Sequence, residues 1–342
     1  MGTQVFAAPD VSAGPAQVAV GEMFIGSDDA FLPVELESLC TDTEKRFSLY
    51  LKVQPGKYVL YLSEEHPLRE SHRLNLIKHG TEHLHVHVKD RTSYLSYVEQ
   101  HLDSILRRES LPSDTKAKII HTSVGRALEE VFEEPRAEFI QRSKNMIRST
   151  VDLALSDPAT THSLLSLTMH DHYTYNHSVN VGIYGVALTK ELFDHISGRE
   201  LHELAAGFFL HDLGKCRINP EILNKGEQLS EEEWAEVRRH PQWSNEILES
   251  TGHLTREARI ITLQHHERHD GQGYPNGLRG DEIHTYARIC CMADVFDALT
   301  SNRPYRKGSS TFEAIETMKG EMANEFDPQF FKKFVLLFAQ ED

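Results

Sequence analysis

The feature that most constrains the fold of this chain is an ordered series of histidine and aspartate residues in a stretch with helical periodicity. The series comprises His177, the pair His211-Asp212, His240, the pair His265-His266, and Asp294. Neutral imidazoles and carboxylates are the groups with which proteins bind Mn, Fe, Ni or Zn. Seven such groups are too many for a single ion, so we expect a site for two or more metals, a common arrangement for attacking phosphodiesters.

The pair His211-Asp212 is informative because of its surroundings. It follows an apolar helical segment, Leu204–Leu210, and precedes Gly214, a residue suited to end a helix. A histidine and a carboxylate at the end of a buried helix are costly unless they have partners. Neighbouring helical residues point about 100° apart, so both side chains can reach one ion only near the rim of a pocket, with Asp212 free to bridge two ions.

Asp294 and the pair His265-His266 also adjoin apolar sequence. Asp294 lies within Cys290–Phe296, where burial would raise its pKa and neutralise it unless a cation kept the carboxylate charged. The two adjacent histidines end the apolar segment Ile260–Gln264. We therefore interpret these three side chains as metal ligands.

His177 and His240 are less informative when each is taken alone. His177 shares the inward face of a helix with Val181 and Tyr184, where a hydrogen-bonded core histidine is the alternative. His240 precedes Pro241, which predicts an extended conformation at a helix junction, and an ordinary surface residue is the alternative. A fold that buries the other ligands would bring these two residues to the same place.

Composition excludes several classes of protein. The 342 residues are 39% hydrophobic and 26% charged, which is typical of a globular chain with room for two domains. The formal net charge of −16 argues against binding to polymeric nucleic acid. No apolar segment is long enough to span a membrane, the N-terminus has no export pattern, and the four cysteines show no CxxC spacing. We expect a cytoplasmic protein.

The pattern divides the chain into four parts. Residues 1–17 predict a disordered lead, and residues 18–90 predict a small α+β module for sensing or regulation. This module contains a hairpin formed by residues 47–53 and 58–62, a helix over 69–78 and a strand over 83–88. Residues 91–140 predict a helical connector, and residues 141–342 predict an all-α domain. The predicted fold class is therefore mainly α.

The ordered motifs resemble those of the HD-GYP family, a branch of the HD phosphohydrolases. The resemblance covers roughly residues 160–320, and six separate motifs agree in order. The matching segments are Tyr173-Thr174-x-x-His177-Ser178, His211-Asp212-Leu213-Gly214-Lys215, Arg239-His240-Pro241, His265-His266-Glu267-Arg268, Asp270-Gly271-x-Gly273-Tyr274-Pro275 and Ala293–Thr300, followed by Arg303–Arg306.

The resemblance implies an all-α, HD-type phosphodiesterase that opens cyclic di-GMP to linear pGpG and, with a second cut, to GMP. The implied cofactors are two divalent transition metal ions, Fe or Mn foremost, with Ni, Co or Zn as alternatives. They would activate a water that attacks phosphorus in line. The implied metal ligands are His177, His211, Asp212, His240, His265, His266 and Asp294.

The resemblance also implies roles for residues around the metals. Asp212 and Lys215 are the expected catalytic residues: Asp212 bridges the metals, and Lys215 binds the phosphate or protonates the leaving oxygen. The alternative for Lys215 is a helix-capping lysine. Arg303 and Arg306 resemble the ligand-contacting pair of the family, since guanidinium groups bind phosphate oxygens or a guanine edge in a bidentate manner; a surface turn is the alternative.

Two further features have an open role. The loop Gly273-Tyr274-Pro275 either packs beneath the pocket or contacts a regulatory protein, and the N-terminal module is a second place for such a partner. Asp171 is expected to lie behind the metals or near Lys215. The connector helices also suit a homodimer.

One position departs from the family pattern. Some members carry a glutamate four residues before the first histidine and bind a third metal through it, whereas this chain has Tyr173 there. A neutral phenol is a poor ligand, so we expect two metals and pGpG as the product.

Two other functions are compatible with the residues. The first is a cyclic di-GMP receptor or scaffold with little turnover, although the complete ligand set argues against it. The second is a phosphodiesterase for another cyclic dinucleotide such as cyclic GMP-AMP, because metals act on the phosphate and do not read the base.

Overall fold

The computed structural model describes residues 23–25, 27–168, 176–193, 195–302 and 307–338. The chain divides into two compact units, Met1–Arg107 and Arg108–Asp342. The boundary falls within the segment 91–140, so that helix α2 belongs to the first unit and helix α3 to the second.

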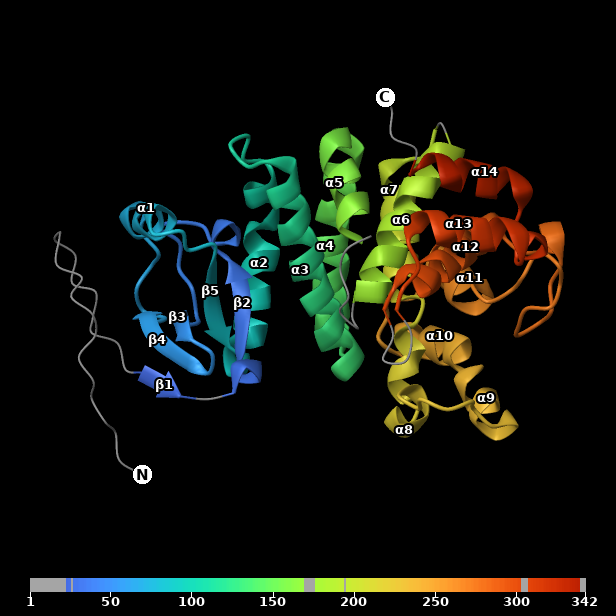
Figure 1. The fold of residues 1–342 in the computed structure, drawn as a ribbon, viewed down its shortest axis with the longest axis horizontal. Coiled ribbons are helices and arrows are strands. Elements are labelled where there is room, and N and C mark those ends of the chain that lie inside the picture. The colour runs from blue at the N-terminus through green and yellow to red at the C-terminus, as the bar shows by residue number, and fades with distance from the viewer. Residues whose placement is uncertain (1–22, 26, 169–175, 194, 303–306, 339–342) are drawn as a thin grey trace. The chain divides into compact units, whose positions relative to one another are not determined.

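The first unit contains a five-stranded antiparallel sheet in the order β1-β4-β3-β5-β2 (Figure 1). Strands β3 and β4 form the predicted hairpin, and β5 is the predicted third strand. Helix α1 precedes β5, and helix α2 packs against β5. The bounds are β1 Met23–Ile25, β2 Phe31–Glu35, β3 Leu49–Gln54, β4 Lys57–Leu62, α1 Glu70–Lys78, β5 His83–His87 and α2 Arg91–Leu106, with short 3-10 turns at Asp28–Ala30, Leu36–Ser38 and Val88–Asp90.

Strands β1 and β2 were not predicted from the sequence. β2 contains Pro33, which lacks a backbone N–H and so argues against a central strand. The structure places β2 at the edge of the sheet, where proline is tolerated. β1 has only three residues, which is too short for an alternating pattern to be read.

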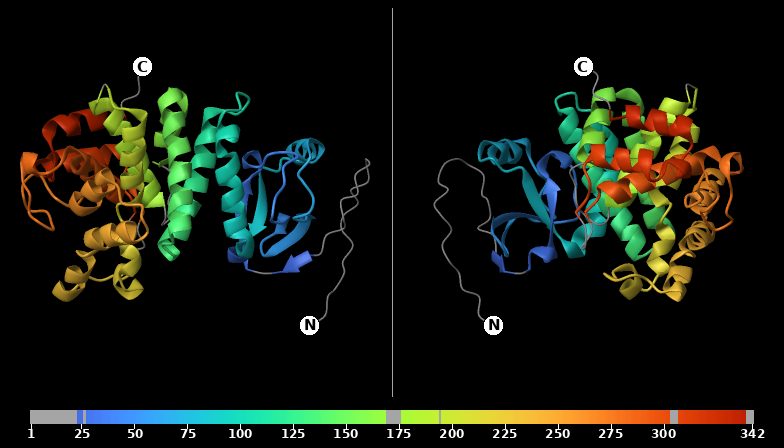
Figure 2. Two further views of the ribbon diagram at one scale, coloured as in Figure 1. Left: turned by 180° about the vertical axis from the view of Figure 1, so that it is seen from behind. Right: turned by 45° about the vertical axis from the view of Figure 1, so that its right-hand side comes forward.

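All regular elements in the described part of the second unit are helices, and Figure 2 shows them as coiled ribbons coloured from green to red. The predicted all-α fold of this region is confirmed. The helices are α3 Ser113–Glu133, α4 Ala137–Ser156, α5 Pro158–Thr168, α6 Asn176–Leu192, α7 Gly198–Leu210, α8 Pro220–Leu223, α9 Glu231–Val237, α10 His240–Ser250, α11 Arg256–Gln264, α12 Thr285–Thr300, α13 Thr311–Gly320 and α14 Pro328–Leu336, with 3-10 turns η4 Leu213–Arg217, η5 Gly280–Glu282 and η6 Ala323–Glu325.

Helix α6 lies at the centre of the second unit, where it packs against α3, α7 and α12. Its residues from Ser178 to Thr189 are all buried. Gly182 and Gly185 bring α7 close, because a Cβ atom at these positions would lie 2.5 Å from Cγ of Phe209 and 2.7 Å from Cδ2 of Phe208, respectively. These close approaches place the C-terminal end of α7 beside the N-terminal half of α6.

Among the residues that the structure describes, no helix combines the length and the apolar character needed to cross a membrane.

The contact at Gly182 leads to a testable expectation. Gly182→Ala should lower the free energy of unfolding by about 1–3 kcal/mol, because the added methyl group would overlap the Phe209 ring and force α6 and α7 apart. Urea denaturation followed by circular dichroism measures this change. Gly198→Ala is the matched control, since no atom lies within 4 Å of a Cβ there. Equal midpoints for both variants and the native chain would contradict the expectation.

Candidate metal centre

The seven residues singled out from the sequence converge on one place in the second unit. Most lie at helix ends: His177 is in the first turn of α6, His211 and Asp212 follow α7, His240 begins α10, and His265 and His266 follow α11. Asp294 lies within α12. Helix ends suit such a site because side chains from several helices meet there without disturbing the helical hydrogen bonds.

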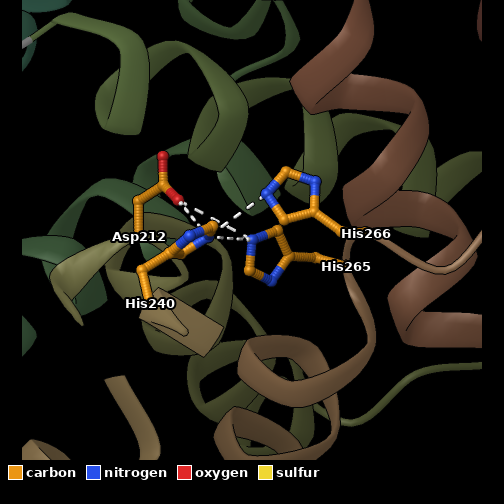
Figure 3. Close-up of side chains that lie close together, drawn as sticks. All are labelled: Asp212, His240, His265 and His266. Carbon is orange, nitrogen blue, oxygen red and sulfur yellow. Dashed lines mark hydrogen bonds and ion pairs between the residues drawn. The ribbon is translucent and has the colours of Figure 1, made fainter. Parts of the chain in front are cut away.

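Asp212 and three histidines form the first group of potential metal ligands (Figure 3). Their ligand atoms all lie within 4.8 Å of one another. Nε2 of His240 lies 3.1 Å from Oδ1 of Asp212 and 3.2 Å from Nε2 of both His265 and His266. The ligand atoms of these four side chains are therefore close enough together to bind one ion.

A second group consists of His177, His211 and Asp212. Oδ2 of Asp212 lies 3.3 Å from Nε2 of both histidines. Asp294 adjoins both groups, since its Oδ1 lies 3.2 Å from Nε2 of His177 and its Oδ2 lies 3.7 Å from Nδ1 of His266. Asp212 is thus common to the two groups and presents a different oxygen to each.

The outer nitrogen of each buried histidine has a partner that sets the ring's tautomer. Nδ1 of His211 donates to the carbonyl of Phe208 at 2.7 Å, and Nδ1 of His240 donates to that of Val237 at the same distance. Nδ1 of His265 donates to carbonyls in the last turn of α11. A neutral imidazole that donates through Nδ1 carries its lone pair on Nε2, so these rings direct lone pairs inward.

The inward direction of these lone pairs favours binding of a cation. Nε2 of His240 and Nε2 of His265 are 3.2 Å apart, and two inward lone pairs at that distance repel unless a positive charge lies near them. Nε2 of His177, Nε2 of His211 and Oδ1 of Asp212 are buried without a hydrogen-bond partner. Such atoms are costly in a protein interior, and a divalent metal is the partner that suits nitrogen and carboxylate donors together.

Burial divides the centre into a floor and a mouth. The side chains of His211, His240, His265 and Asp212 are at most 3% exposed. His177, His266, Asp294 and Lys215 are between 13% and 31% exposed. These four partly exposed residues form the mouth of the centre, and a ligand from solvent reaches the buried residues by passing them.

The groups around the two carboxylates lower the pKa of each. Burial favours a higher pKa for Asp212, but Lys215 and the neighbouring histidines hold this pKa well below its ordinary value. Nζ of Lys215 donates to Oδ2 of Asp212 at 2.5 Å. Burial likewise favours a higher pKa for Asp294, and His177 with the other histidines lowers it.

The pKa values of the histidines shift in two directions. Burial favours a lower pKa for His177, but three aspartates, Asp212, Asp294 and Asp297, raise the pKa of this ring well above its usual value. Burial lowers the pKa of both His240 and His266. Neutral imidazoles at these two positions are the form that binds metal.

Two local predictions around the centre were wrong. His240 is the first residue of α10 rather than extended, because Pro241 occupies the second helical position, where its missing N–H costs nothing. Gly214 does not end a helix; it lies inside η4, and a Cβ there would come within 2.6 Å of the backbone nitrogen of Ser244. Glycine is required at this position because η4 packs closely against α10.

The loop Gly273-Tyr274-Pro275 folds back against the histidine pair. A Cβ on Gly273 would lie 2.6 Å from Cα of Glu267. The Tyr274 ring stacks on the His266 ring with centroids 4.6 Å apart, and the backbone N–H of Tyr274 donates to the carbonyl of His266 at 3.0 Å. Of the two roles left open by the sequence, packing against the ligands is the one for which the structure supplies contacts.

Several supporting residues were not singled out from the sequence. Asp297 accepts from Nδ1 of His177 at 2.7 Å and from the side-chain amide of Asn180 at the same distance. The buried carboxylate of Glu267 accepts from the backbone N–H groups of Asn276 and Leu278 and so shapes the loop. Asp297 lies one helical turn after Asp294 and within the segment Ala293–Thr300 that resembles the family, and these two signals could have identified it.

Four positions of interest fall outside the described residues. They are Asp171, Tyr173, Arg303 and Arg306. Their expected roles stay predictions from the sequence.

Comparison with known proteins places this centre in a family. Residues 169–330 match the family model of the HD domain. A cyclic di-GMP phosphodiesterase of Pseudomonas aeruginosa is 41% identical over 173 residues, which cover 51% of this chain and 41% of that protein. A 3'3'-cGAMP-specific phosphodiesterase of Vibrio cholerae is 36% identical over 159 residues, covering 46% of this chain and 34% of that protein.

A third relative, a cyclic di-GMP phosphodiesterase of Thermotoga maritima, is 33% identical over 171 residues, covering 49% of this chain and 45% of that protein. The chain thus spans less than half the length of these curated relatives. A solved Bdellovibrio bacteriovorus structure, described as an HDG"Y"P protein, shares the fold with a TM-score of 0.62 and 22% identity, covering 89% of this chain and 98% of that chain. Residues 169–330 of this chain belong to the HD domain family, and the motifs that resemble its HD-GYP branch lie within them.

Proposed function

We propose that this chain is a metal-dependent phosphodiesterase that hydrolyses cyclic di-GMP to linear pGpG. The observation that carries the proposal is the position of Asp212, whose two oxygens face two separate groups of histidines. A carboxylate shared in this way suits a pair of divalent ions, and paired ions are a recurrent device in phosphodiester hydrolysis.

His177 and His211 would hold one ion and His240, His265 and His266 the other, with Asp212 between them and Asp294 alongside. When bound, the ions supply an acidified water and offset the charge that develops on the phosphate. The chain's own residues keep the lone pairs aimed inward through the backbone carbonyls behind them. Fe and Mn are the proposed metals, because imidazole and carboxylate groups suit both ions.

Lys215 is the proposed acid or phosphate ligand. It lies at the mouth, 31% exposed, with Nζ on the bridging carboxylate. From there its ammonium group is placed to neutralise a phosphate oxygen or to protonate the leaving oxygen. Arg303 and Arg306 are proposed to bind the rest of the substrate.

Cyclic di-GMP is favoured as substrate because relatives over the same region carry that name. A 3'3'-cGAMP-specific relative at 36% identity supports cyclic GMP-AMP as the second candidate. Tyr173 in place of a glutamate supports two metals rather than three, with pGpG as product. Cytoplasmic location, a homodimer and a regulatory protein partner stay predictions from the sequence.

Turnover by the full chain distinguishes these substrates. After loading with Mn or Fe under reducing conditions, the chain should convert cyclic di-GMP to pGpG faster than it converts cyclic GMP-AMP, as followed by chromatography of the products. Faster cleavage of cyclic GMP-AMP would reassign the substrate. Tight binding of cyclic di-GMP without linear product, in fully metallated protein, would instead indicate a receptor.

The shared position of Asp212 predicts an unequal effect of two ligand substitutions. Asp212→Ala should abolish binding of both ions, whereas His211→Ala should remove one, because only Asp212 belongs to both groups. Metal content per folded chain, measured by inductively coupled plasma mass spectrometry, reports this difference. His202→Ala, which removes a histidine of α7 bonded to Asp152, is the control and should retain two ions. Retention of two ions by Asp212→Ala would refute the bridging role.

Lys215 has a matched control elsewhere in the unit. Lys215→Met should reduce turnover of cyclic di-GMP by about 100-fold or more, the range for loss of a general acid, while both ions stay bound. Lys225→Met should leave turnover unchanged, since Lys225 is equally exposed at 31% and pairs with Glu233 rather than with a ligand. Equal turnover of the two variants would show that Lys215 only caps its helical turn.

A further inference from the structure

A line of buried polar side chains leads away from the metal centre on the side of His177. Nδ1 of His177 and the side-chain amide of Asn180 each lie 2.7 Å from a different oxygen of Asp297. Oδ1 of Asn180 in turn lies 3.0 Å from Nε2 of His121. The line joins three helices, because His121 is on α3, His177 and Asn180 are on α6, and Asp297 is on α12.

The direction of every hydrogen bond in this line is determined. A carboxylate accepts, so both His177 and Asn180 must donate to Asp297. With its NH2 group on Asp297, Asn180 turns its carbonyl oxygen toward His121, and Nε2 of His121 must therefore carry the donated proton. When a metal ion is bound, His177 would hold its proton on Nδ1 and turn the lone pair of Nε2 toward the ion, on the side that faces Asp212 and Asp294.

Because this line of side chains is buried, its polar groups need hydrogen-bond partners within the protein. Asp297 and Asn180 are each 1% exposed and His121 is 4% exposed, so water does not replace a lost partner. Ser301 adds a donor to the same oxygen of Asp297 that His177 uses, at 3.0 Å. A flip of the Asn180 amide would place its oxygen against the carboxylate, and the donated proton of His121 opposes that flip.

We propose that Asn180 and His121 are positioning residues for one of the two metal ions, the ion that His177 and His211 would hold. They act through Asp297 by fixing the tautomer and orientation of His177. The proposal rests on the metal-dependent function above, and it makes α3, which supplies no ligand, a determinant of metal affinity. Residues behind metal-bound histidines typically change metal affinity by about 10–100-fold when they are replaced.

The test measures metal affinity rather than turnover. Mn²⁺ is titrated into the metal-free full chain, and free Mn²⁺ is followed by electron paramagnetic resonance to give a dissociation constant for each ion. Asn180→Asp and His121→Phe should each weaken one ion by about 10–100-fold and leave the other within about threefold. Asn180→Asp is nearly isosteric and sets a second carboxylate against Asp297, so its effect should be the larger.

Two further variants separate positioning from packing. His121→Gln restores an N–H donor toward Asn180 and should recover most of the lost affinity. Ser123→Ala removes another buried polar group of α3, 1% exposed, and should bind both ions as the native chain does. Circular dichroism of the metal-free proteins confirms that each variant is folded.

Native affinity for both ions in folded Asn180→Asp would overturn the proposal, as would equal weakening of both ions or no recovery in His121→Gln. Failure of the proposed function is read separately. A native chain that binds two Mn²⁺ ions and cleaves no cyclic dinucleotide would refute the enzyme, while the affinities of the variants would still decide the role of His121 and Asn180. A native chain that binds no Mn²⁺ would overturn both proposals.

Discussion

The helical unit is organised around the burial of one carboxylate. Asp212 is 3% exposed, and Lys215, His211 and His177 hold the pKa of its carboxyl group well below the ordinary value despite this burial. His177 and His211 come from the ends of α6 and α7, and His240 and His265, at the ends of α10 and α11, lie within 3.7 Å of Oδ1 of Asp212, so the ends of four helices meet at this residue. The close contacts at Gly182 and Gly214 serve the same geometry, because they let α7 and η4 approach their neighbours without an intervening side chain.

Much of the helical unit could be predicted from its sequence because its pattern combines two independent signals. Helical periodicity identified the all-α fold, and polar ligands set against apolar segments identified positions that need a partner. His211-Asp212 and Asp294 are examples, and the structure brings them together with the other predicted metal ligands. The hairpin of β3 and β4 was recognised for a similar reason, since alternation and a Pro-Gly turn agree there.

What the sequence did not reveal depends on backbone geometry. The carbonyls of Phe208 and Val237, which orient two histidines, belong to residues whose side chains carry no signal of that role. Pro241 favoured an extended His240 by a local rule, whereas the start of α10 accommodates proline at its second position. The contact between Asp297 and Asn180 could be identified only from the structure, because it depends on the packing of α12 against α6.

The count of charges among the ligands has a consequence for recognition. The proposed ligand set contains five imidazoles but only Asp212 and Asp294 as acids, so two divalent ions would leave this set with an excess of two positive charges. The chain as a whole carries a formal charge of −16 and repels anions at a distance. A phosphodiester would therefore be attracted only at short range and only to the loaded centre, so that in the proposed reaction metal occupancy would be the condition for substrate binding as well as for cleavage.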